Sequence, residues 1–372
     1  MKLLFLHSIA AGSGANVHID EFIAAATARG AEIRCVGQAT ESVRVQGRRV
    51  GLPLPRLVKD WVHLSRDGAF RRGAEAAVRA WRPDAVYFRG ALYMGYGRAV
   101  AQAHGLPLFY ELNTPFPGEH LEFHGGHFGG HARRVERANR EAARRIFTVS
   151  RQLADILVAD GAPAGKLVVV PNGVTLERFD PAPRPDDGQV RFGFVGSLQV
   201  WHGVDVMLDA FERVLATLPN AHLHIAGDGP LAAPVAAARR RSPHADRLHL
   251  HGPLPHAAIP AFLRDLDVLL APYPALPRFY FSPLKLFEYL AAGRVVVASA
   301  LGQIADVLRD DVDGCLLPPG DPDALAHCCL ELAADPARRR RLAAAARARA
   351  ADHTWDASAR VILDHVRADL GG

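Results

Sequence analysis

The sequence contains little cysteine, methionine or tryptophan, with 4, 3 and 4 residues of these types among 372. The cysteines are Cys35, Cys315, Cys328 and Cys329, and none forms a C-x-x-C pair of the kind found in zinc and redox motifs. Because a secretory context is also missing, we expect reduced thiols, as in cytosolic proteins.

Long apolar segments are missing as well. No run approaches the roughly 20 apolar residues that span a bilayer. The strand-like start, KLLFLHS, lacks the charged region and long apolar core of a secretion signal. We therefore expect a cytoplasmic protein. Contact with the cytoplasmic face of a membrane stays open, because Arg44, Arg48, Arg49 and Arg56 could meet anionic lipid, although solvated loop charge explains them too.

What is present is an ordinary globular composition, with 49% hydrophobic and 22% charged residues and a net charge of +5. The mild basicity suits an anionic substrate. Arginines are spread along alanine-rich segments such as Arg133–Arg145 and Arg338–Arg349, without the interleaved aromatics of a nucleic-acid site. We therefore expect no nucleic-acid partner.

Strand-like and helix-like segments alternate along the chain. In the first half, strands such as Leu3–Leu6 and Ala85–Phe88 are followed by helices such as Val17–Ala28 and Leu92–His104. This alternation predicts a parallel sheet with helices on both faces.

A linker rich in Pro, Asp and Gly interrupts the alternation at Pro181–Gly188. The pattern then restarts and ends in a long helical segment from Asp321 to about Ala351. We expect an α/β protein with two Rossmann-like doubly wound domains, residues 1–182 and 183–352, facing a central cleft. A last helix, 353–372, would pack back on the first domain. Ligands of such sheets bind at the carboxyl ends of the strands.

The stretch Pro277–Ser299 predicts a loop, a helix and a buried strand. Ser282 suits the N-cap, Pro283 the first helical position and Gly293 the C-terminal cap. Lys285 lies in the first turn, where the helix dipole disfavours a cation, and Glu288 follows on the same face. This pattern favours an anion site at the helix start, and an ordinary surface Lys–Glu pair is the alternative.

Three glycine loops occupy strand-to-helix junctions. They are Gly12-Ser13-Gly14, Gly193–Ser197 with Trp201-His202-Gly203, and Gly227–Pro230. Each could let a phosphate approach the backbone, with a tight turn or a helix cap as the alternative, and at Gly227–Pro230 a turn with Pro at the first helical position is sufficient by itself. His202 would pair with a phosphate if protonated, or donate one hydrogen bond if neutral.

Further motifs extend along nearly the whole chain: GSGANVHIDEFIAAATARGAEI, LPLFYELNTP, IFTVSRQLADIL, VVVPNGVTLERFDP, FGFVGSLQVWHGVDVMLDAF, HIAGDGP, DVLLAPYP, SPLKLFEYLAAGRVVVAS and LLPPGDPDALA. With them the chain resembles the retaining GT-B glycosyltransferases of family four, also called glycosyl transferases group 1. The WHG and SPLKLFEY forms indicate a subgroup of that family.

The resemblance implies a nucleotide-diphosphate sugar as donor substrate and no separate cofactor. It implies roles at the diphosphate for Lys285 and His202, and near the reacting sugar carbon for Glu111 and Asn113. The other implied donor-binding residues are Glu288 for the ribose, Phe281, Ser282, Pro283 and Leu284 for diphosphate and sugar, Ser197, Gly12, Ser13 and Gly14 for diphosphate, and Gly227 and Leu254 beside the base.

The chain departs from the family pattern at two places. Tyr280 stands where a first glutamate is frequent, and Ser197 and His202 replace an arginine and a lysine that bind phosphate. We therefore expect Lys285 to take over much of the charge neutralisation.

The function that follows is retaining transfer of a sugar to an acceptor hydroxyl in glycan, polysaccharide or glycoconjugate biosynthesis. The acceptor could be a sugar, a lipid-linked molecule or a small molecule. A non-catalytic nucleotide-sugar-binding partner of another transferase is the alternative, and a nicotinamide-dependent oxidoreductase is disfavoured by the incomplete G-x-G motif.

We expect no metal. The acidic pairs Asp265/Asp267 and Asp311/Asp313 lie beside a strand and in a turn. The loop with His120, His124, His127 and His131 has no compact ligand motif and reads better as a mobile acceptor-side loop.

Overall fold

The computed structural model describes residues 1–9, 14–37, 56–115, 117, 127–182 and 184–371, which form two compact units. The first unit comprises Met1–Pro171 and Trp355–Gly372, and the second comprises Asn172–Thr354. The sequence suggested a first boundary at residue 182. Residues 172–182 instead pack within the second unit, where Phe179 joins the apolar core and Arg294 donates to the carbonyl oxygens of Pro181 and Ala182.

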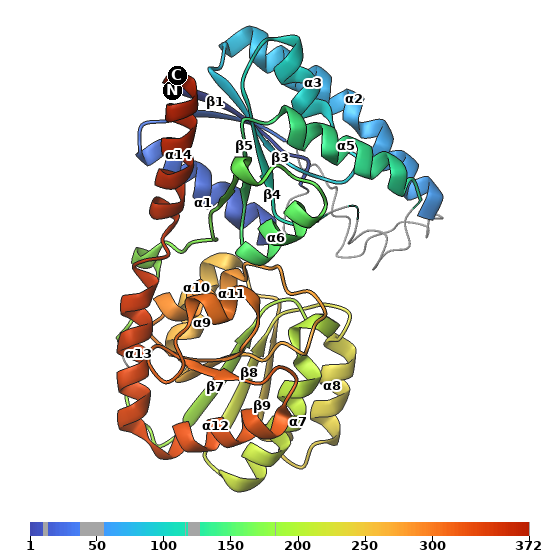
Figure 1. Cartoon of the computed structure of the whole chain (residues 1–372). Coiled ribbons are helices and arrows are strands. Elements are labelled where there is room, and N and C mark those ends of the chain that lie inside the picture. The colour runs from blue at the N-terminus through green and yellow to red at the C-terminus, as the bar shows by residue number, and fades with distance from the viewer. Residues whose placement is uncertain (10–13, 38–55, 116, 118–126, 183, 372) are drawn as a thin grey trace. The chain divides into compact units, whose positions relative to one another are not determined.

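The first unit is built on a six-stranded parallel sheet with the strand order β2-β1-β3-β4-β5-β6 (Figure 1). Its strands are β1 (Lys2–Leu6), β2 (Glu32–Val36), β3 (Ala85–Arg89), β4 (Leu108–Leu112), β5 (Arg145–Thr148) and β6 (Leu167–Val169). Its helices are α1 (Gly14–Ala28), α2 (Arg56–Trp81), α3 (Tyr96–Ala103), α5 (Gly129–Ala142), α6 (Arg151–Ala159) and α14 (Trp355–Gly371).

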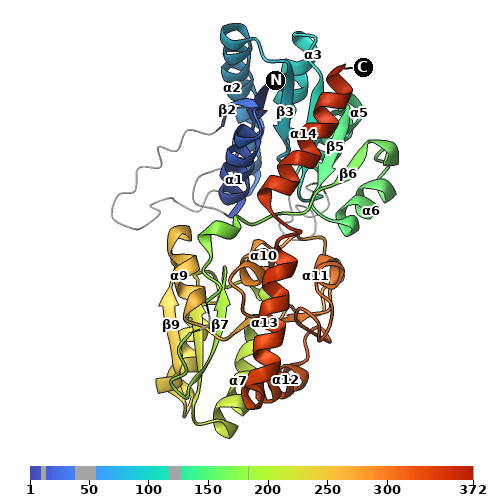
Figure 2. The same ribbon diagram turned by 90° about the vertical axis from the view of Figure 1, so that its left-hand side faces the viewer.

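Helices α1 and α14 lie side by side on one face of this sheet (Figure 2). Their apolar residues, such as Phe22 and Leu363, pack with Phe5, Tyr87 and Phe147 of the strands. Buried apolar runs on β3 and β4 explain why these strands occupy the middle of the sheet.

The second unit repeats the plan with the strand order β12-β11-β10-β7-β8-β9. Its strands are β7 (Val190–Val195), β8 (Ala221–Ala226), β9 (Leu248–Gly252), β10 (Val268–Ala271), β11 (Val295–Ser299) and β12 (Cys315–Leu317). Its helices are α7 (Val204–Thr217), α8 (Ala232–Arg241), α9 (Ile259–Arg264), α10 (Leu284–Ala291), α11 (Gly302–Val307), α12 (Pro322–Ala334) and α13 (Pro336–Ala350).

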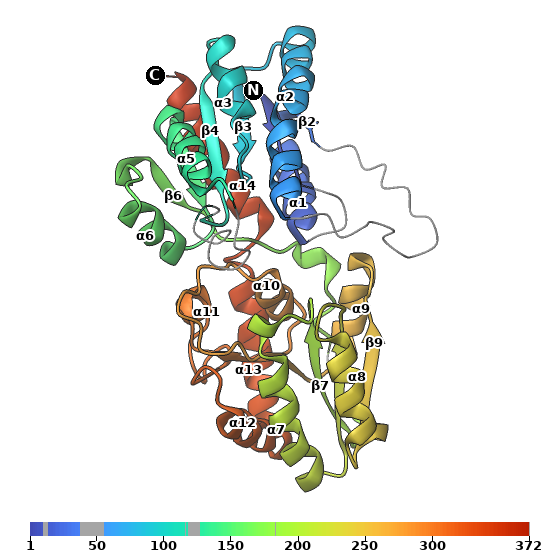
Figure 3. The same ribbon diagram turned by 90° about the vertical axis from the view of Figure 1, so that its right-hand side faces the viewer.

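The core of the second unit has one layer on each face of the sheet. Helices α7 and α12 lie side by side on one face (Figure 3), whereas α9, α10 and α13 supply the apolar cluster on the other. The predicted run Val295–Val297 is buried in β11 between β10 and β12, as expected for a strand covered on both faces.

Two predicted helices differ from the structure. The segment 321–351 is two helices, because Pro336 has no N–H to continue the first and the Asp335 side chain accepts from the N–H of Arg338 to start the second. The helix predicted from Leu92 begins only at Tyr96, where Asp67 of α2 accepts from the N–H groups of Gly95 and Tyr96.

No helix among the described residues is long and apolar enough to span a membrane.

Candidate functional site

Helix α10 begins differently from the prediction. The N-cap is Pro283, without a side-chain hydrogen bond, so the prediction that Ser282 caps the helix is wrong. Instead Ser282 Oγ accepts from the N–H of Asn172 at 3.0 Å, and Asn172 Nδ2 donates to the Ser282 carbonyl at 2.6 Å. The PNGV turn thus fixes the loop before α10. Gly293 has φ +60° just after the helix, which confirms the predicted glycine at its C-terminal end.

Lys285 is buried in the first turn of α10, with 8% of its surface exposed. Its Nζ lies 4.0 Å from the ring centroid of Phe194 and 5.6 Å from that of Tyr273, and within the described part of the chain it has no hydrogen-bond partner. Burial lowers the pKa of Lys285 from 10.5 to about 7, although the negative charge of Glu288 opposes the shift.

The backbone of Gly196 faces this ammonium group. Gly196 follows β7 with φ +148°, and a Cβ there would lie 2.6 Å from Lys285 Nζ. Glycine therefore both permits the backbone turn and leaves room beside the cation.

His202 lies next to this loop and contacts the Tyr273 ring edge-on at 5.6 Å. Burial and the positive charge of Lys285 lower the pKa of His202 to about 3, so the ring is neutral near pH 7. Its Nδ1 lies 2.5 Å from the carbonyl oxygen of Ser197. Because a carbonyl only accepts, Nδ1 carries the proton and Nε2 presents a lone pair. The ring N–H that we expected to donate to a phosphate thus donates to the backbone carbonyl of Ser197.

Glu288 is buried one turn further along α10 and belongs to a chain of three polar side chains. Arg178 Nη2 lies 3.2 Å from His256 Nδ1, and His256 Nε2 lies 2.8 Å from Glu288 Oε1. Since guanidinium only donates, Nδ1 must accept and Nε2–H must donate to the carboxylate. The described residues make no other hydrogen bond to the Glu288 carboxylate. Burial of Lys285 and Glu288 rules out the alternative of a surface pair.

The remaining residues implied for the donor in this unit lie on loops around α10, except Leu284, which begins the helix. Ser197 is exposed after β7, Gly227 follows β8, and Leu254 follows β9 and packs against the core. Phe281 and Leu284 are half-buried and Pro283 is buried. Tyr280, at the position of the missing glutamate, is buried with its ring centroid 4.5 Å from that of Phe281. An aromatic side chain, and no carboxylate, thus fills that position.

In the first unit, Glu111 at the end of β4 is 3% exposed. Its Oε1 accepts from Arg89 Nη1 at 2.5 Å and Asn113 Nδ2 at 2.7 Å, and lies 2.9 Å from His18 Nε2. Its Oε2 accepts from Tyr87 at 2.9 Å. Although burial favours the neutral acid, His18 and Arg89 hold the pKa of Glu111 well below its ordinary value. The carboxylate is therefore a shared acceptor for side chains from several elements.

Several predicted residues fall outside the described ranges, namely Gly12, Ser13, Arg44, Arg48, Arg49, His120 and His124. Gly14 begins α1 and Arg56 begins α2. His127 is described, and its backbone N–H donates to Asp60 of α2. The acidic pairs make structural contacts: Asp267 accepts from the N–H of Arg191, and Asp313 from the N–H and side chain of Arg309. The described residues contain no cluster that could hold a metal ion.

Sequence reasoning missed Arg178, His256, Phe194 and Tyr273 as parts of this site. His256 lies in no quoted motif. Arg178, Phe194 and Tyr273 lie in quoted motifs, but the motifs do not show which of their side chains reach the site. Their loops or strands precede α10 by about 10 to 105 residues, so only the fold brings them to it.

Two parts of the chain match models of known protein families. Residues 189–335 match the family described as glycosyl transferases group 1, and residues 12–178 match glycosyltransferase family 4. A D-inositol 3-phosphate glycosyltransferase of Xylanimonas cellulosilytica is 29% identical, over 94% of this chain and 90% of its own.

Solved structures show the same fold. Sucrose-phosphate synthase from Thermosynechococcus elongatus superposes with a TM-score of 0.76 at 18% identity, covering 100% of this chain and 99% of its own. Anabaena HepE in complex with UDP has a TM-score of 0.74 at 17% identity, covering 99% and 100%. The predicted GT-B fold, with two α/β domains on parallel sheets, is confirmed, and each half of the chain matches a glycosyltransferase family model.

Proposed function

We propose that this chain, which has the GT-B fold and a glycosyltransferase match in each half, is a retaining glycosyltransferase that uses a nucleotide-diphosphate sugar and no metal. One observation carries the proposal most. Lys285 is a buried cation without a hydrogen-bond partner among the described residues, at the start of a helix and at the carboxyl ends of β7 and β10. A diphosphate would neutralise that charge.

Lys285 would act on the leaving group. As the bond between the sugar carbon and the diphosphate oxygen breaks, negative charge grows on that oxygen, and a preorganised cation in a dry site stabilises it strongly. The acceptor oxygen forms the new bond on the same face, and its proton passes to a donor-phosphate oxygen. No side-chain nucleophile is required.

Glu288 would bind the ribose. Its Oε1 is occupied by His256, whereas Oε2 has no hydrogen bond within the described chain and could accept from a ribose hydroxyl. The neutral His202 would accept, through Nε2, from a sugar hydroxyl or from a protonated phosphate. Tyr280 would shape the sugar pocket without contributing charge.

The similar proteins suggest which substrates to test first. HepE has been crystallised with UDP and with UDP-glucose, so uridine donors are the first choice. The relative from Xylanimonas is named for D-inositol 3-phosphate, which makes phosphorylated inositols the first acceptors. Other sugars and lipid-linked acceptors follow in the screen.

The test compares the wild type with Lys285→Met, and uses Lys166→Met, in the first unit, as a matched control. We expect donor affinity to fall about 10–150-fold, since a hydrogen bond to a charged group is worth about 1.5–3 kcal/mol. Turnover at saturating donor should fall about 10²–10³-fold, as for loss of one leaving-group stabiliser. Isothermal titration with UDP and a transfer assay measure the two effects.

Unchanged turnover in Lys285→Met would remove Lys285 from the mechanism. Donor binding that depends on Lys285, without transfer to any acceptor and without donor hydrolysis, would instead favour the non-catalytic nucleotide-sugar-binding partner.

A further inference from the structure

The second unit contains a cavity of about 490 Å³ that is separate from the donor site. It lies beside Gln189, Asp267 and Arg294, which directly precede β7, β10 and β11. By contrast, Gly196 and Tyr273, which lie beside Lys285, follow the carboxyl ends of β7 and β10. Because β7 has 6 residues, the two ends of the sheet are about 20 Å apart.

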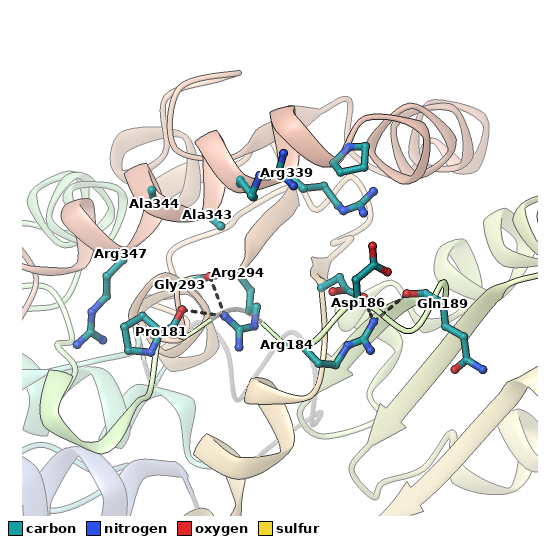
Figure 4. Close-up of a pocket in the computed structure, with 13 residues that line it drawn as sticks. Pro181, Arg184, Asp186, Gln189, Gly293, Arg294, Arg339, Ala343, Ala344 and Arg347 are labelled. Carbon is teal, nitrogen blue, oxygen red and sulfur yellow. Dashed lines mark hydrogen bonds and ion pairs between the residues drawn. The ribbon is translucent and has the colours of Figure 1, made fainter.

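Arginine dominates the wall of this cavity. Arg184, Arg294, Arg339, Arg340 and Arg347 line it, together with Asp186 and Asp267, so five positive charges face two negative ones and the net charge is +3. Figure 4 shows Arg294 between Pro181 and Arg184, with Arg339, Ala343 and Ala344 on the overlying helix α13.

Most of these guanidinium groups bond to neutral backbone oxygen. Arg294, only 4% exposed, donates to the carbonyl groups of Pro181, Ala182, Gly293 and Arg264. Arg339 donates to the last carbonyls of α12, and Arg347 to the carbonyl of Ala291 at the end of α10. Carbonyl groups satisfy N–H donors but do not cancel a full positive charge.

Two further features leave capacity for an anion. The Arg340 side chain is exposed and forms no hydrogen bond or ion pair within the described chain. Arg184 is paired with Asp267 and Asp187, yet its Nε and that of Arg294 are buried without a hydrogen-bond partner among the described residues. The positive field is thus only partly compensated.

We propose that this cavity is a second ligand site, which binds a soluble phosphorylated small molecule. Planar guanidinium groups match the oxygens of a phosphate, and a cluster of them is the usual device for binding phosphate esters. The volume lies within the range of small-molecule sites and exceeds what a single phosphate ion needs.

The test is a calorimetric titration of the protein with inorganic pyrophosphate at constant ionic strength. Because pyrophosphate could also enter the donor site, all proteins carry Lys285→Met. Arg340→Glu reverses one charge in the cavity, and Arg240→Glu makes the same change on the exposed last turn of α8. Ala344→Tyr fills the cavity and leaves every charge in place.

We expect binding to persist in Lys285→Met and to weaken at least about tenfold, or ~1.4 kcal/mol, with Arg340→Glu or Ala344→Tyr. Arg240→Glu should leave it unchanged, and Asp186→Asn should strengthen it. Absence of binding in Lys285→Met would overturn the proposal, as would equal weakening by Arg340→Glu and Arg240→Glu. If phosphatidylglycerol vesicles bind in an Arg340-dependent way and pyrophosphate does not, the site binds a membrane surface and the proposed soluble ligand is wrong. Circular dichroism of each variant confirms that it folds.

Discussion

Each unit buries a charged side chain near the carboxyl ends of its strands, and the two charges have opposite surroundings. Glu111 in the first unit accepts from Arg89, Asn113 and Tyr87. Lys285 in the second unit faces two aromatic rings and, within the described chain, no hydrogen-bond acceptor. A buried ion with a full set of partners organises the structure around it, whereas one without partners destabilises the fold unless a ligand compensates it.

The pKa shifts of Glu111 and Lys285 differ in the same way. The partners of Glu111 hold its pKa well below the ordinary value, so the ionised form is favoured in the folded protein. Burial lowers the pKa of Lys285 to about 7, so the ionised form is disfavoured there. We infer that Glu111 positions the side chains around it and that Lys285 is available to bind an anion.

The largest effect should come from removing the uncompensated charge. The unfolded chain keeps the Lys285 proton up to about pH 10.5, whereas the folded chain loses it near pH 7. The free energy of unfolding therefore rises with pH between these two values. Below pH 7 the buried charge lowers it by up to about 5 kcal/mol. Lys285→Met should therefore raise the free energy of unfolding, more at about pH 6 than at about pH 10. Urea unfolding at both pH values measures this.

Lys166→Met serves as the control and should give no such gain. If Lys285→Met lowers the stability at acidic pH, the charge is compensated in the folded protein and the contrast with Glu111 disappears.

The second prediction concerns Glu111→Gln. This change keeps the shape but leaves Arg89 as a buried cation without its carboxylate, which should cost about 3–5 kcal/mol of unfolding free energy. Since the lowered pKa of Glu111 means that it must be protonated on acid unfolding, the wild type should also lose stability as the pH falls below the ordinary carboxyl range.

A double-mutant cycle with Arg89→Met sharpens the result, because the double variant should recover part of the loss. A Glu111→Gln protein of unchanged stability that no longer transfers sugar would assign Glu111 to catalysis instead.

The smallest effect concerns His256, which orients Glu288. His256→Ala should weaken UDP binding by about 1 kcal/mol, because one hydrogen bond to the carboxylate is lost. His256→Gln, which can still donate, should recover much of it. If the effect passes through Glu288 and the ribose, His256→Ala should leave the affinity for the 2′,3′-dideoxy form of UDP unchanged. Equal weakening of both nucleotides would indicate a general loss of structure.

The fold and the centre of the site could be predicted from local patterns. Alternating strands and helices gave two parallel sheets, and Lys285 stood out as a cation in the first turn of a helix. The partners could not be predicted, because they come from distant segments. The hydroxyl of Ser282 accepts from the N–H of Asn172, 110 residues earlier, instead of capping the helix. Phe194 and Tyr273 contact Lys285 from the ends of two strands. For the same reason the four neighbours of the Glu111 carboxylate could not be predicted, and its implied place near the reacting sugar carbon stays a prediction.

Direct observation of the Lys285 ammonium group tests the central claim. The chain contains only 4 lysines, Lys2, Lys59, Lys166 and Lys285, so the side-chain signals of a protein labelled with ¹³C-lysine can be assigned with single variants. A pH titration of the Lys285 signal should give a pKa of about 7 without ligand and a value at least about one unit higher with saturating UDP, since the bound diphosphate favours the charged form. A pKa near 10.5 without ligand, or one that UDP leaves unchanged, would contradict the account.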